Sequence, residues 1–285
     1  MDPRDSGRIA RRMDALHGIT YFVPETEEHL VGVGLVPGRM TYFAGRSAAM
    51  GAVGAGVVTA TFYNFNPALV ATHIPAAWTL ASPATVVTAR YASVDAALRR
   101  LLGAEALAAP EVVEAAGLAR IAAEACTPQG RPLAAAHLDL DWPTDPHMVL
   151  WHAVTILREH RGDAHVTLLL GAELDGLEAL ISHAAVGRGF LVEFAQQSRG
   201  WRPEVWATGV ARLQERGILD ADGAITEDGR ALRARIEHDT DRLGNGPWTA
   251  LGAERAARLA EILQGIAAAL FAAGAYPEGL FAKAR

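Results

Sequence analysis

Apolar residues recur with a helical period along most of the chain, and turn-forming residues separate the periodic segments. The clearest segment is DPHMVLWHAVTILREHRG, with Asp145 as N-cap, Pro146 as the first helical residue and Gly162 just past the end. Asp163 is then expected to cap a second helix that begins AHVTLLLGAE. The pattern predicts two helices that meet at a buried corner at Gly162.

The next segments alternate between helix and turn signals. Asp175 and Glu178 form a pair typical of a capping box, a short segment FLVEFAQQ follows, and a strong helix is expected over 203–217. The text ILDADGAITEDGRALRARIEHDTDRL predicts a short strand, a turn at Gly223, a second strand, and a helix capped by Thr226. Helices followed by a two-stranded hairpin and another helix are typical of a winged helix-turn-helix.

This region carries a resemblance to known regulators. The stretch VARLQERGILDADGAITEDGRALR resembles the recognition helix and wing of MarR-type regulators, over a region of about sixty residues. Over most of its length the chain is similar to an actinobacterial family of helix-turn-helix proteins of unknown role. The resemblance implies ligand-responsive regulation but no particular chemistry.

The N-terminal half weakly repeats the pattern of the C-terminal half. In each half an aromatic-led helix reaches a glycine, Gly51 or Gly162, and a second apolar helix follows. MarR-type proteins are dimers of shorter chains, so a duplicated chain could form its own pseudo-dimer. We therefore predict a mainly α fold of two winged-helix-like halves, with a short β-hairpin wing. Residues 1–130 would form a helical, degenerate half, and residues 131–285 a winged half with C-terminal helices.

Composition narrows the class of protein. The 285 residues are 51% hydrophobic, yet no apolar run approaches the length of a membrane span. The net charge of −6 does not favour nucleic-acid binding, and Cys126 is the only cysteine. The N-terminus lacks the apolar region of a secretory signal, so we expect a cytoplasmic protein that binds no membrane.

Six ionisable residues fall within eight positions between two apolar runs. They are Arg158, Glu159, His160, Arg161, Asp163 and His165. Capping and ion pairing at a helix junction would explain them without any function. Alternatively, the arginines could clamp an anion while a histidine shuttles a proton. A metal site is a weaker third interpretation, because Gly162 separates the donors, and we predict neither a metal nor a cofactor.

A second group of residues could form the wall of a ligand pocket. Helical spacing also fits a role for its aromatic rings in the core. Combined with the charged cluster, the candidate ligand-binding residues are Tyr42, Phe43, Arg46, Tyr63, Asn64, Trp78, His152, Arg158 and Arg161.

Four arginines of the helix-turn-helix region could contact phosphates: Arg199, Arg202, Arg212 and Arg216. However, Glu204 lies in the first turn of the candidate recognition helix, and Asp220 and Asp222 lie in the candidate wing. Acidic groups there repel the DNA backbone, so we predict weak or lost DNA binding.

The sequence thus favours a protein that binds a small anionic or aromatic molecule in an interior cleft and acts as a ligand-responsive regulator. The alternative is an enzyme of specialised metabolism that needs no organic cofactor and uses His160, Asp163 and His165 for acid–base chemistry. In either case we expect a small-molecule partner and an oligomer or intramolecular pseudo-dimer.

Overall fold

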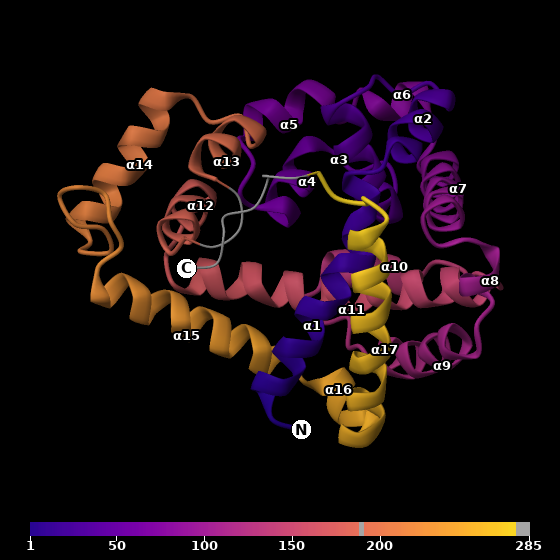
Figure 1. The fold of residues 1–285 in the computed structure, drawn as a ribbon. Helices are drawn as coiled ribbons and strands as arrows, with labels where there is room; N and C mark the ends of the chain where they lie inside the picture. Colours follow the sequence, from indigo (N-terminus) through magenta and orange to yellow (C-terminus); the bar gives the residue numbers. More distant parts are fainter. Residues whose placement is uncertain (188–190, 278–285) are drawn as a thin grey trace. The chain divides into compact units, whose positions relative to one another are not determined.

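The computed structural model describes residues 1–187 and 191–277, and these residues are folded almost entirely into helices (Figure 1). Contacts divide the chain into two compact units, each assembled from segments that are distant in sequence. Among the described residues, unit 1 comprises 1–53, 73–164 and 241–276, and unit 2 comprises 54–72, 165–187, 191–240 and 277. The sequence boundary predicted at residue 130 remains a prediction.

Unit 1 holds most of the helices. They are α1 (Pro3–His17), η1 (Gly18–Tyr21), α2 (Pro24–Gly32), α3 (Arg39–Ser47), η2 (Ala48–Met50), α6 (Ala77–Leu80), α7 (Pro83–Leu102), α8 (Ala104–Leu107), α9 (Pro110–Glu124), α10 (Pro132–Leu138), most of α11 (Pro146–Gly171), α16 (Gly246–Leu251) and α17 (Ala253–Ala272). Unit 2 holds α4 (Ala55–Phe62), α5 (Pro67–His73, apart from its last residue), α12 (Gly176–Ala185), α13 (Val192–Ser198), α14 (Pro203–Glu215) and most of α15 (Glu227–Leu243).

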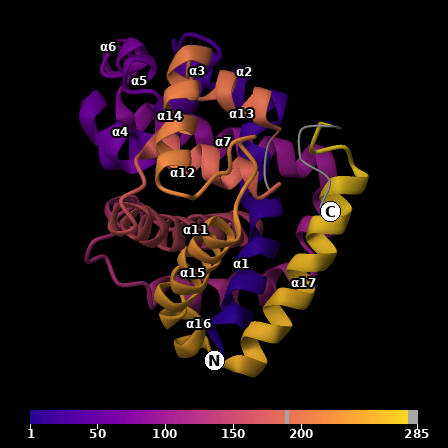
Figure 2. The same ribbon diagram turned by 90° about the vertical axis from the view of Figure 1, so that its left-hand side faces the viewer.

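The core of unit 1 forms around the first part of α11. Trp151 is fully buried there, in a cluster that also contains Met13 of α1, Leu98 of α7 and Leu259 of α17. Helices α1 and α17 lie side by side in both views (Figures 1 and 2). The buried face of α9 consists largely of alanines, whose small side chains let neighbouring helices approach closely.

Unit 2 packs α12 against α14 through a glycine. A Cβ placed on Gly209 would lie 2.7 Å from a side-chain atom of Ile181 and 2.9 Å from Leu177, so the two helices approach more closely than a larger residue allows. Two helix caps predicted from the sequence are present in unit 2. Asp175 and Glu178 complete the predicted capping box. The Thr226 hydroxyl accepts from the Gly229 amide at the start of α15, as predicted.

The predicted β-hairpin wing is wrong, and with it the fold of two winged-helix halves. Between α14 and α15 the described residues form one isolated bridge, Leu219 to Ile225, and no strand. The Asp220 carboxylate accepts from the amides of Asp222 and Ala224, which closes a tight turn. Because α15 already begins at Glu227, too little chain remains for a second strand. The fold is mainly α, without a wing.

The predicted helix corner at Gly162 is also wrong. Helix α11 runs without a break through Gly162, as one helix of 26 residues. A glycine inside a helix costs only about 1 kcal/mol relative to alanine. The burial of Trp151, Leu157 and Ala164 along the same helix outweighs that cost. Positions 160, 163 and 165 therefore have fixed helical directions.

Replacing Gly162 with alanine is expected to raise the free energy of unfolding by about 1 kcal/mol, because alanine favours helix and fits the site. A Cβ at Gly162 would meet its nearest neighbour, Glu159 Oε2, at an ordinary 3.5 Å. Gly217→Ala is the matched control. Since Gly217 has a φ of +67°, alanine should destabilise the protein there. Urea denaturation of both variants tests this, and a loss of stability in Gly162→Ala would contradict the continuous helix.

Candidate functional site

Unit 1 contains a cavity of about 380 Å³ between α2, α3, α7 and η1. That volume is at the small end of the range of ligand pockets. Its lining residues are Thr20, Tyr21, Val23, Thr26, Glu27, Leu30, Gly38, Arg39, Thr41, Tyr42, Gly45, Arg46 and Arg90. Nine of these thirteen residues have polar or charged side chains, which favours a polar ligand.

Arg90 is the least expected residue of this cavity. It lies on α7, is only 3% exposed, and its guanidinium stacks 5.0 Å from the centre of the Trp151 ring. Within residues 1–187 and 191–277, the Arg90 side chain has no hydrogen bond and no ion pair. Buried charges are normally paired, because removing an ion from water costs several kcal/mol. Arg90 is therefore a buried cation on a cavity wall without a protein counterion.

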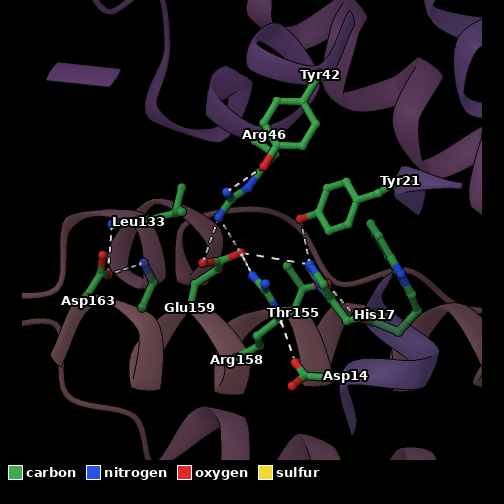
Figure 3. Close-up of polar contacts among 12 residues, drawn as sticks. Asp14, His17, Tyr21, Tyr42, Arg46, Leu133, Thr155, Arg158, Glu159 and Asp163 are labelled. Atoms are coloured by element: carbon green, nitrogen blue, oxygen red, sulfur yellow. Dashed lines mark hydrogen bonds and ion pairs between the residues drawn. The ribbon is translucent and has the colours of Figure 1, made fainter. Parts of the chain in front are cut away.

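Unlike Arg90, the arginines Arg46 and Arg158 both form ion pairs with carboxylates. Both oxygens of Glu159 accept from Arg46 Nη2 at 3.3 Å, and Glu159 Oε1 accepts from Arg158 Nη1 at 2.8 Å (Figure 3). Arg158 also reaches Asp14, at 3.3 Å. Arg46 lies within 5.8 Å of the ring centres of Tyr21 and Tyr42, whose rings tilt toward each other.

Glu159 is ionised in this setting. Burial alone would raise the pKa of its carboxyl, but the positive charges of Arg46 and Arg158 outweigh burial and lower that pKa to about 2. The side chain is only 5% exposed, so solvent screens these charges weakly. Glu159 therefore offsets the charge of Arg46, which lines the cavity, at neutral pH.

His17 joins the network from the end of α1. It is fully buried, and its Nδ1 lies 3.1 Å from the Thr155 hydroxyl while its Nε2 lies 2.8 Å from the Tyr21 hydroxyl (Figure 3). Burial, with the nearby charges of Arg158 and Arg90, lowers the pKa of His17 well below its usual value. The ring is therefore neutral at pH 7.

The charged cluster on α11 divides between separate roles. Asp163 Oδ2 accepts from the amides of Leu133 and Ala134 at the start of α10 (Figure 3). Asp163 was predicted to cap a helix that begins at Ala164, but it instead caps the start of α10. Arg161 pairs with Asp241 at 2.8 Å. His165 belongs to unit 2, where it lies 2.9 Å from the Thr240 hydroxyl.

His160 does not resemble a general base. It is 3% exposed, and its Nε2 has no hydrogen-bond partner in the part of the chain that the structure describes. Burial, aided by the charge of Arg131, lowers its pKa to about 4. Burial raises the pKa of Asp163 to about 6. No observation brings His160, Asp163 and His165 together around a shared space, so nothing here favours the enzyme alternative.

Stability should fall when the pH drops from about 6.5 to 4. In the folded state burial lowers the pKa of His137 to about 3 and of His152 and His160 to about 4, whereas an unfolded histidine titrates near 6.5. Below pH 6.5 the unfolded chain therefore binds more protons, which favours unfolding by up to about 3 kcal/mol for His160 alone. Asp163 acts in the opposite sense over the same range, but three histidines outweigh it.

Urea denaturation at pH 7.5 and pH 4.5 tests this dependence. His160→Gln should flatten the pH profile, because it removes one of the groups that protonate only on unfolding. A protein that is more stable at pH 4.5 than at pH 7.5 would contradict the assignment of neutral buried histidines.

The other predicted ligand-binding residues fall in three places. Tyr42 and Arg46 line the cavity. Phe43 and His152 are fully buried in unit 1, and the Trp78 indole donates to the Val53 carbonyl; these three residues do not line the cavity. The remaining two residues, Tyr63 and Asn64, belong to unit 2. The Tyr63 hydroxyl donates to the Leu174 carbonyl at 2.6 Å, and the Asn64 carbonyl accepts from Trp201.

One comparison bears on the identity of the chain. A family model described as a helix-turn-helix family matches residues 6–277, almost the whole length. The chain belongs to this helix-turn-helix family. Neither a curated protein nor a solved structure is significantly similar to it. Among the described residues, no helix is long and apolar enough to cross a membrane.

In this member of the helix-turn-helix family, the four arginines predicted to contact phosphates all have intramolecular partners. Arg212 pairs with Asp175 at 2.6 Å and with Glu178 at 3.0 Å. The remaining partners are Glu178 and two backbone carbonyls for Arg216, Glu204 for Arg202, and the Ser198 hydroxyl and the Phe65 ring for Arg199. To contact DNA, each of these arginines would have to exchange its protein partner for a phosphate.

The sequence reasoning missed Arg90, Tyr21 and Thr26, and did not give Glu159 a role. A signal for Arg90 existed. It lies four residues after Val86 and four before Val94, and both valines are fully buried. An arginine in the middle of an apolar helical stripe indicates a buried charge that needs a partner. Tyr21 and Thr26 carry no comparable pattern.

The described residues hold one cluster with the spacing of metal ligands: Asp95, Asp145 and His147. Arg99 pairs with both aspartates, at 2.9 and 3.3 Å, and His147 Nε2 lies 2.6 Å from Asp95. Arg99 already occupies oxygens of both carboxylates, so the geometry does not call for a cation.

Proposed function

We propose that this helix-turn-helix protein is a ligand-responsive regulator, and that its ligand is a small anion held in the cavity of unit 1 by Arg90. The observation that carries the proposal is the buried Arg90 guanidinium, which has no protein counterion among the described residues. An anion entering the cavity would supply that counterion. Arginine suits this role because its planar fork matches a carboxylate or phosphate.

The rest of the cavity wall supports the same proposal. The Thr26 hydroxyl oxygen is buried without a hydrogen-bond partner in the described chain, although it lines the cavity. The Tyr21 and Tyr42 rings add flat surfaces for the body of a ligand. A polar atom on a cavity wall that has no protein partner can form a hydrogen bond to a polar ligand.

A preparation of the protein from its native host tests whether a ligand is bound. We expect mass spectrometry to find one small anion per chain, released when the protein is denatured. Arg90→Gln should lose this anion, whereas Arg99→Gln, on the exposed face of the same helix, should keep it. An anion that is equally abundant in both variants, or absent from the unmodified protein, would contradict the proposal.

The regulatory part of the proposal concerns DNA. Because the four arginines of the helix-turn-helix region have protein partners, we propose DNA binding that is weak and steeply dependent on salt. Fluorescence anisotropy with a duplex from upstream of its own gene measures the affinity, with and without the released anion. We expect an anion-dependent change and a Kd weaker than about 10⁻⁸ M. Tight binding that the anion leaves unchanged would overturn this part.

A further inference from the structure

The charges around the cavity limit how much negative charge a ligand can carry. Two guanidinium groups, those of Arg46 and Arg90, line the cavity, and a third, that of Arg158, shares the carboxylate of Glu159 with Arg46 and also pairs with Asp14. Glu159 and Asp14 both pair with Arg158, and Glu159 also pairs with Arg46, so only the charge of Arg90 lacks a counterion. Two further lining residues, Arg39 and Glu27, carry opposite charges. One unbalanced positive charge fits one carboxylate better than a phosphate dianion.

The hydrogen bonds of His17 fix the direction of the next contact. The Thr155 hydroxyl donates to the Trp151 carbonyl at 2.8 Å, so its proton is used and its oxygen accepts from His17 Nδ1. A neutral histidine that carries its proton on Nδ1 has an accepting Nε2. The Tyr21 hydroxyl must therefore donate its proton to His17 Nε2, at 2.8 Å.

Because the Tyr21 hydroxyl donates its proton to His17, the Tyr21 oxygen can only accept further hydrogen bonds. Its one proton points at His17, and the described residues make no other hydrogen bond to its oxygen. Tyr21 also lines the cavity. A ligand can therefore satisfy the Tyr21 oxygen only by donating to it, from a hydroxyl or an amine.

We infer that the ligand is a monocarboxylate that also carries a hydrogen-bond donor, with its carboxylate on Arg90 and its donor on the Tyr21 oxygen. The inference rests on the proposed function, since it names the chemical class of ligand for the same cavity. It makes Tyr21 the residue that discriminates a hydroxylated acid from its plain analogue. A site built to receive a donor rejects the analogue that lacks one, because its own polar atom is then left without a partner.

Two probes that differ by a single hydroxyl test the inference: 3-phenylpropionate and 3-(4-hydroxyphenyl)propionate. In titration calorimetry of the full chain we expect the hydroxylated probe to bind about tenfold more tightly, the size of one net hydrogen bond. Tyr21→Phe should abolish this preference, because the oxygen that distinguishes the two probes is gone. Tyr91→Phe is the matched control. It removes a tyrosine hydroxyl that contacts His152 outside the cavity lining, so it should keep the preference.

The possible outcomes separate the two proposals. Equal affinity of both probes for the unmodified protein, or a preference that survives in Tyr21→Phe, would overturn the inference while anion binding stands. If neither probe binds at about 10 mM, where a Kd of 1 mM would give near saturation, the inferred class of ligand is overturned, and the anion content of the native preparation decides separately whether the cavity binds an anion. Tenfold discrimination that depends on Tyr21 supports both.

Discussion

Glu159→Gln is expected to lower the free energy of unfolding by about 3 to 5 kcal/mol, because it removes the buried carboxylate that pairs with the guanidinium groups of Arg46 and Arg158. Glu159 accepts from Arg46 through both oxygens and from Arg158 through one, and its side chain is 5% exposed. Glutamine keeps the size of the side chain but removes its charge, so the loss reports electrostatics rather than a cavity. Guanidinium chloride denaturation at pH 7.5 measures the change.

The matched control is Glu124→Gln on α9. Glu124 pairs with Arg120 at 2.7 Å, but both side chains are about half exposed, and exposed pairs contribute less than about 1 kcal/mol. We therefore expect a large loss in Glu159→Gln and almost none in Glu124→Gln. Equal and small losses in the two variants would contradict the assignment of Glu159 as the counterion of a buried arginine pair.

Arg90→Gln is expected to behave in the opposite way. Because Arg90 has no counterion in the described chain, its removal breaks no ion pair and takes a desolvated charge out of the interior. The free energy of unfolding should therefore fall by no more than about 1 kcal/mol, the contribution of its contact with the Trp151 ring, and a gain in stability is consistent with the account. Binding of 3-(4-hydroxyphenyl)propionate should weaken by about thirtyfold or more, the effect of removing one partner of a desolvated charge pair. Urea denaturation and titration calorimetry measure the two effects.

Arg99→Gln provides the reference for Arg90→Gln. Both arginines lie on α7, but Arg99 is 46% exposed and pairs with Asp95 away from the cavity lining. Its replacement should change neither stability nor binding by a large amount. A purely structural Arg90 would give the reverse pattern, with a clear loss of stability and unchanged binding.

Local rules predicted the parts of this fold that depend on a few neighbouring residues. The start of α11 at Pro146, the capping box of Asp175 with Glu178, and the cap at Thr226 all follow from side chains near the helix end. The rule that a glycine ends a helix failed at Gly162, where the free energy gained by burying a long helix outweighs the low helix propensity of one glycine.

The candidate site could be predicted only in part, because its residues meet through tertiary packing. The sequence grouped Arg46 with Arg158 and Arg161 as candidate ligand-binding residues, and the structure pairs Arg46 with Glu159, a residue to which the sequence assigned no ligand. Arg90 comes from α7, far from both in sequence, and only the packed structure reveals that its charge has no protein counterion. The wing prediction failed because a local resemblance does not fix whether two short segments pair into a sheet.

The central claim is that the Arg90 guanidinium binds a carboxylate, and side-chain NMR of arginine-labelled protein tests it most directly. The Nε–Hε signal of Arg90 is assigned as the one missing from Arg90→Gln, and that of Arg99 from Arg99→Gln. On titration with 3-(4-hydroxyphenyl)propionate, the account predicts a saturable shift of the Arg90 signal and an unmoved Arg99 signal. Binding heat that saturates while the Arg90 signal stays in place would contradict it.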